Sequence, residues 1–276
     1  MFQSKMKPEA TPERVLELCR LVASCDKTVS DSDNSVDKIR EIIEPSATVA
    51  STPYFPAIKK AALELGLLEE ANNLLRFIGD KTTIKDFDHF RRYCNSVLFC
   101  NKSWEFYRIC RAFVQQNDKW FQTGAITSDE SIHSLLELLP DFQFQELKKT
   151  LVLACRFWIS FLGLGYIQES SKILYLPNAY VALKDFIFLA NLEKGREYSM
   201  SEFFELLPRG FSVLHDKEEG TTEINLALSN ALRQLHDAKE IELRRNQDSE
   251  TIWSLYPNED HEFKSSVTHL VYKGVK

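Results

Sequence analysis

The chain has 276 residues, of which 44% are hydrophobic and 12% aromatic. This length exceeds the commonest size of a single domain, so we expect two or three compact units. The apolar content also excludes disorder over most of the chain. The net charge of −6 gives the whole molecule no long-range attraction for nucleic acid, so any such binding would need a local basic face.

The sequence predicts a cytoplasmic protein with no membrane segment. The first ten residues lack the apolar run of a secretory signal. The most apolar stretch, 151–167, is interrupted by Arg156 and is short for a membrane span. The cysteines show no CxxC spacing and lie in helical patterns, which indicates free, mostly buried thiols. They are Cys19, Cys25, Cys94, Cys100, Cys110 and Cys155.

The first segment predicts three helices followed by a two-stranded hairpin. Thr11-Pro12-Glu13 combines a capping hydroxyl, a proline at the first helical position and an acid in the first turn. Gly66 provides the permissive backbone that ends a helix, and asparagines tolerate the left-handed conformation of a tight turn. The expected elements are a helix from Pro12, a polar loop over 26–34, helices over 35–43 and after Pro53, and strands starting at Leu67 and Leu74 around Ala71-Asn72-Asn73.

Two later segments repeat this pattern of helices and a hairpin. In the second, Gly163 ends a long apolar helix before two apolar strands with a polar turn between them. In the third, strict alternation predicts a half-exposed strand pair. The expected elements are helices over 128–139 and 142–162 with a hairpin over 165–176, then helices over 179–192, 199–207 and 224–236 with a hairpin of 239–243 and 251–255 about 244–250.

Between the first two segments lies a section that is rich in aromatic and basic residues. Its spacing predicts amphipathic helices over 84–99 and 102–117, and a linker follows at 123–125. Residues 81–119 hold eight basic side chains and four acidic ones. This section could form a face that binds phosphates and stacks bases. The alternative is that the aromatic side chains form core and the charges lie on a solvated helix face.

Short helices followed by a strand pair are the element order of a winged helix-turn-helix, and the three segments resemble winged-helix domains. The expected fold is mainly α with small β-hairpins, built as tandem winged helix-turn-helix units with a central helical section. The expected domains are a winged-helix unit (1–80), a helical aromatic and basic section (81–122), a second winged-helix-like unit (123–178), a third winged-helix unit (179–257) and a C-terminal tail (258–276).

A second resemblance concerns the first unit. Thr11-Pro12-Glu13-Arg14 and Glu64-Leu65-Gly66-Leu67-Leu68 resemble the helical accessory proteins of bacterial anti-phage and DNA-modification islands, such as the DpdG-like proteins. This resemblance implies a DNA-associated accessory subunit in bacterial regulation or defence, with double-stranded DNA and proteins of a multi-subunit complex as partners. No role of a single residue follows from it.

Direct DNA binding would need basic or amide side chains on recognition helices and wings, because phosphate contacts supply most of the affinity. The first wing instead carries Glu69 and Glu70, which repel phosphate. Tandem winged helices also serve as assembly modules without DNA binding, as in kleisin-binding subunits, and this alternative stays open. The candidate nucleic-acid-binding residues are Arg91, Arg92, Arg108, Arg111, Asn230, Arg233, Arg244 and Arg245.

No residue pattern predicts catalysis, a cofactor or a metal. Asp141, Glu146 and Lys148 match the letters of a PD-(D/E)xK nuclease, but they fall at an expected helix start, where such nucleases have a strand. The dipeptides at His215 and His236 resemble metal-binding HD pairs without the further ligands that such sites need. A phosphate-binding P-loop, a glycine-rich dinucleotide turn and a GxSxG elbow are absent from the sequence. We therefore expect a non-enzymatic protein.

Overall fold

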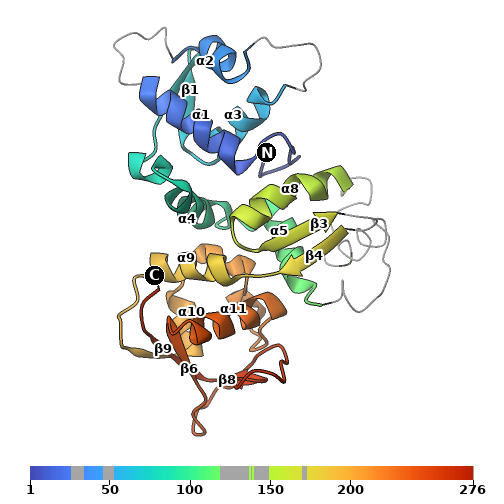
Figure 1. Cartoon of the computed structure of the whole chain (residues 1–276), viewed down its shortest axis with the longest axis vertical. Coiled ribbons are helices and arrows are strands. Elements are labelled where there is room, and N and C mark those ends of the chain that lie inside the picture. Colours follow the sequence, from blue (N-terminus) through green and yellow to red (C-terminus); the bar gives the residue numbers. More distant parts are fainter. Residues whose placement is uncertain are drawn as a thin grey trace.

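The structure is a computed structural model that describes residues 1–25, 34–45, 53–118, 137, 139, 149–169 and 173–275. Within these residues the fold is mainly α-helical with small antiparallel sheets, as the sequence predicts (Figure 1). Outside them lie the predicted loop up to residue 33, the helix over 128–139 apart from residues 137 and 139, and the linker at 123–125. The start of the helix from 142 and the nuclease-like residues Asp141, Glu146 and Lys148 also lie outside. No helix of the described part is long and apolar enough to cross a membrane.

The first unit confirms the predicted helices and hairpin. The Ser35 hydroxyl caps the second helix by accepting from the Lys38 N–H. Asn72 and Asn73 have φ values of 52° and 63°, the left-handed pair that a two-residue hairpin turn requires. The elements are α1 (Pro12–Cys25), α2 (Val36–Ile43), α3 (Phe55–Glu64), β1 (Leu68–Ala71) and β2 (Leu74–Phe77), with β1 antiparallel to β2.

The central section follows as the short 3-10 helix η2 (Lys81–Ile84), α4 (Phe87–Leu98) and α5 (Glu105–Gln115). Four of its aromatic rings are fully buried: Phe90, Phe99, Phe106 and Phe113. These four rings therefore belong to the core and do not form a face on which bases could stack. Phe2, near the start of the chain, packs edge-on against Phe106 and Trp158. This contact joins the first ten residues to the central helices.

The second unit contains α8 (Lys149–Phe161) and the antiparallel pair β3 (Gly165–Glu169) and β4 (Ile173–Pro177). The predicted hairpin is therefore confirmed. Gly163, between α8 and β3, has a φ of 73°, and a Cβ there would lie 2.7 Å from the backbone nitrogen of Ala182. Glycine is needed at this position both for the turn and for the close approach of the next helix.

The C-terminal unit is built on one three-stranded sheet in the order β5-β9-β6. Its elements in chain order are α9 (Tyr180–Ala190), β5 (Glu197–Ser199), α10 (Met200–Leu206), η3 (Arg209–Val213), η4 (Lys217–Glu219), α11 (Leu226–Asp237), β6 (Ile241–Arg244), β7 (Trp253–Ser254), β8 (Ser266–Val267) and β9 (His269–Tyr272). The predicted helices of this unit are confirmed, while β5 has no counterpart in the sequence-based expectation.

The predicted hairpin of 239–243 with 251–255 is wrong. β6 pairs with β9, which places Leu243 opposite Leu270 with both side chains buried, whereas β7 pairs with β8. Trp253 instead packs edge-on against Phe204, with ring centroids 4.9 Å apart. Residues expected as a C-terminal tail therefore supply two strands. The strands pair according to how their apolar side chains pack on α10, and not with the strand that is nearest in sequence.

His215 gives the fold a pH dependence. Its ring is 3% exposed and lies 5.2 Å from the Phe204 and Trp253 rings, and burial lowers its pKa below the usual value of about 6.5. Near the usual pKa, His215 therefore binds a proton more readily in the unfolded chain than in the folded chain. We expect the free energy of unfolding to be highest above about pH 7 and to fall as the pH drops below about 6.5.

Urea unfolding at several pH values measures this dependence. The His215→Phe variant should lose this component, while His89→Gln, at a half-exposed position, should keep it. An unchanged pH dependence in His215→Phe would contradict the assignment.

Candidate functional site

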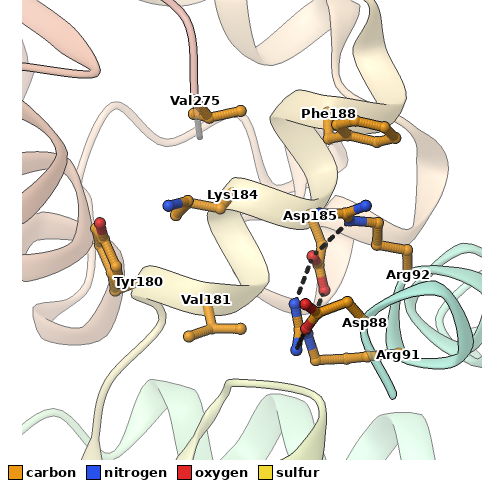
Figure 2. A pocket seen from close by; sticks show the side chains of 9 residues that line it. All are labelled: Asp88, Arg91, Arg92, Tyr180, Val181, Lys184, Asp185, Phe188 and Val275. Atoms are coloured by element: carbon orange, nitrogen blue, oxygen red, sulfur yellow. Dashed lines mark hydrogen bonds and ion pairs between the residues drawn. The ribbon is translucent and has the colours of Figure 1, made fainter. Parts of the chain in front are cut away.

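A pocket of about 340 Å³ opens between α4 and α9, the helices that join the central section to the C-terminal unit (Figure 2). The Asp86 carboxylate caps α4 by accepting from the His89 N–H at 2.9 Å, and this fixes the helix start one turn before the pocket. The lining residues are Asp88, Arg91 and Arg92 from α4, Tyr180, Val181, Lys184, Asp185 and Phe188 from α9, and Val275.

Asp185 is the buried centre of this site, with 2% of its side chain exposed. Arg91 donates from Nε to Oδ2 at 2.8 Å and from Nη2 to Oδ1 at 3.1 Å, in a bidentate pair. The Asn95 amide donates to Oδ2 at 2.9 Å. A charge removed from water is stable only when it is paired and hydrogen-bonded, so this network clamps α4 to α9.

Arg92 uses its guanidinium differently from Arg91. Its Nε lies 3.5 Å from Asp185 Oδ1, and the centre of its guanidinium lies 4.2 Å from the centroid of the Phe188 ring. Within the described residues its Nη1 and Nη2 donate no hydrogen bond, and the side chain is 27% exposed. Figure 2 shows the guanidinium beside both the ring and the carboxylate. Arg92 therefore keeps donors that a ligand could use.

The basic side chains of α5 and the loop before it also turn toward the C-terminal unit. Lys102 Nζ lies 2.8 Å from Asp216 and 2.6 Å from Glu218. Arg111 donates to the Leu214 carbonyl at 2.9 Å and to Glu219 at 2.8 Å. Acids of the C-terminal unit thus balance much of the basic excess of the central section. Arg108, on the same helix, is half-buried.

The polar face of α11 is covered by the segment 256–264. Arg233 is 3% exposed and donates to the carbonyls of this segment at 2.7 to 3.0 Å. Asn230 accepts from Arg233 at 3.4 Å. The acceptors of Arg233 on the segment are the carbonyls of Tyr256, Phe263 and Lys264.

Two histidine–carboxylate pairs also join α11 to the segment 256–264, with the histidine on α11 in one pair and on the segment in the other. His236 of α11 lies 2.7 Å from Glu262 of the segment, and His261 of the segment lies 3.2 Å from Asp237 of α11. The Nδ1 atom of each ring accepts a backbone N–H, so Nε2 faces the carboxylate. Side chains on this face of α11 therefore hold the chain's own backbone and acids. In the described residues no group of three histidine, cysteine or acidic side chains is placed to hold a metal.

Arg244 is the last residue of β6 and Arg245 follows it, and the two have opposite environments. Arg244 contacts Glu242 at 2.8 Å and Glu197 at 3.1 Å. Lys273 and Arg244 together lower the pKa of Glu242 to about 2. Arg245 is exposed and lines a polar groove with Asn246 and Gln247, and it makes no ion pair within the described residues.

The structure does not gather the eight predicted nucleic-acid-binding residues on one face. It places them in four pairs, on α4, on α5, on α11 and at the C-terminal end of β6, where Arg245 follows the strand. The residue that sequence reasoning missed is Asp185. An available signal was its position inside the apolar run of residues 179–192, because a carboxylate buried there must find a cationic partner.

Comparison with known proteins gives one match. The model of a protein family described as DpdG-like matches residues 5–249, which is most of the chain. No curated protein and no solved structure matches.

Proposed function

The chain belongs to the DpdG-like family, and we propose that it is a non-enzymatic accessory subunit of a DNA-modification island that works by assembling with protein partners. Family membership is consistent with an accessory protein of such an island.

The observation that carries this proposal is the internal use of the predicted phosphate-contacting arginines. In three of them, every guanidinium nitrogen contacts an acceptor of the same chain; they are Arg91, Arg233 and Arg244. A phosphate contact by Arg91 or Arg233 would break a buried network, which costs several kcal/mol. Such residues support the fold and are poor candidates for reading DNA.

The C-terminal unit supports the same role. We infer that it is a winged-helix unit, because its helix–strand–helix–helix–strand–loop–strand order and β5-β9-β6 sheet match that arrangement. In this frame α11 holds the position of the recognition helix and residues 245–268 the position of the wing. Since the segment 256–264 covers the polar face of α11, the unit presents no open recognition face to a DNA groove.

A second candidate is direct DNA contact through the wing. Arg245 is exposed there beside Asn246 and Gln247, side chains that can contact phosphates and bases. One arginine supplies little of the electrostatic affinity that a DNA-binding protein needs. We therefore place this contact second, as an addition to protein assembly.

Co-expression with the proteins encoded beside it tests the proposed role. We expect the chain to co-purify with at least one of them in a fixed ratio, and to do so equally after nuclease treatment. Loss of the partner on nuclease treatment would show that DNA bridges the two, and would favour direct DNA binding instead.

A further inference from the structure

We propose that the pocket between α4 and α9 binds a nucleotide, with its phosphate on Arg92 and its base on Phe188. This inference is independent of the assembly role, because it rests on the pocket alone. It assigns a ligand to the one predicted arginine of α4 whose terminal nitrogens are unused within the described residues.

Arg92 has the properties of a phosphate-binding residue. The guanidinium is held in place on one side by the Phe188 ring and on the other by Asp185, so little conformational entropy is lost when a ligand binds. Its two terminal nitrogens remain as parallel donors, the geometry that matches two oxygens of a phosphate. Asp185 balances the Arg92 charge only in part, because it is shared with Arg91, which holds it in a bidentate pair.

Phe188 has the properties of a stacking platform. Phe188 is 55% exposed, so a planar ligand can reach its ring. Stacking on an aromatic ring contributes about 1–3 kcal/mol per base and tolerates any base. One face of the Phe188 ring carries the Arg92 guanidinium, so a base would stack on the exposed remainder of the ring.

The remaining lining residues define the size and chemistry of the pocket. Its volume of about 340 Å³ lies at the small end of ligand sites, which suits one nucleotide. Tyr180 and Lys184 add a hydroxyl group and a second cation, although Lys184 is paired with Glu240 at 2.9 Å. The ligand is therefore a single phosphate-bearing base, either free or as an unpaired nucleotide of a DNA strand.

Isothermal titration of the full chain with four probes tests this site and separates the two sources. The probes are a deoxynucleoside monophosphate, the same nucleoside without phosphate, inorganic phosphate and a short single-stranded oligonucleotide. We expect the monophosphate to bind more tightly than the nucleoside or phosphate alone. Binding of the oligonucleotide at least about tenfold tighter than the monophosphate would identify strand DNA as the source, and the reverse order would identify free nucleotide.

Two variants and a matched control make the test specific. Arg92→Gln should weaken monophosphate binding at least about tenfold, and Phe188→Leu should weaken monophosphate binding by a larger factor than it weakens the binding of inorganic phosphate. Arg156 over Phe157 on α8 is a similar arginine–phenylalanine pair outside the pocket, with the guanidinium centre 4.6 Å from the ring. The control Arg156→Gln/Phe157→Leu should bind as wild type does.

Three results would overturn the proposal. They are the absence of binding by the wild-type chain to all four probes at millimolar concentration, unchanged affinity in both pocket variants with native melting curves, and an equal loss in the control. Phe188→Leu keeps the test valid if Arg92→Gln fails to fold, because Phe188 makes no hydrogen bond that the fold would lose.

Discussion

Replacing Asp185 with alanine should lower the free energy of unfolding by about 3–5 kcal/mol, one of the two largest effects expected in this chain. The substitution leaves the Arg91 guanidinium, 18% exposed, without its bidentate partner and removes the shorter of the two hydrogen bonds that the buried Asn95 amide donates. Uncompensated buried charge is the main cost. Urea unfolding followed by circular dichroism measures this change.

Asp88 provides the matched control for this prediction. It contacts the same Arg91 at 2.6 Å, but its side chain is 64% exposed. Solvent-exposed ion pairs contribute about 0–1 kcal/mol, so Asp88→Ala should change stability little. Equal effects of the two substitutions would show that Asp185 is not the buried centre of the network.

Replacing Arg233 with leucine should lower the free energy of unfolding by about 3 kcal/mol or more. The leucine fills part of the apolar volume, yet the carbonyls of Tyr256 and Phe263 lose the Arg233 donor, and the Lys264 carbonyl keeps only the Asn258 N–H. Each buried carbonyl left without a partner costs about 1–3 kcal/mol. Amide hydrogen exchange should rise over 256–264 and stay low in α4.

Gln234→Ala is the control for Arg233, because Gln234 is the exposed neighbour on the same helix. Its effect should stay within about 0.5 kcal/mol. Unchanged exchange over 256–264 in Arg233→Leu would contradict the covering of α11 by this segment.

Local signals made much of the helical framework predictable. Thr11-Pro12-Glu13 marks the start of α1, and Asn72-Asn73 form the left-handed turn that their side chains favour. Such features depend on a few neighbouring residues, so they can be predicted from a single sequence. The buried aromatic rings of α4 and α5 follow in the same way from helical spacing.

Pairing over long distances was not predictable in this way. β9 reaches β6 and β5 across the chain because Leu270 packs between them, and a nearer strand in sequence was the natural expectation. The basic residues posed the same difficulty. A local excess of positive charge at Arg91, Lys102 and Arg111 looks like a phosphate-binding face until the fold brings Asp185, Asp216 and Glu219 against it. The charge pattern of one segment does not show which acidic residues a distant segment will bring against it.

We propose that this protein works through protein partners and does not bind DNA through these arginines. Light scattering of the nuclease-treated, co-expressed complex at about 0.5 M salt tests it most directly, since salt screens phosphate contacts strongly at that concentration. We expect a molar mass that corresponds to the chain plus its partner. A chain that elutes alone, and that binds duplex DNA at low salt with an affinity falling steeply as salt rises, would contradict the claim.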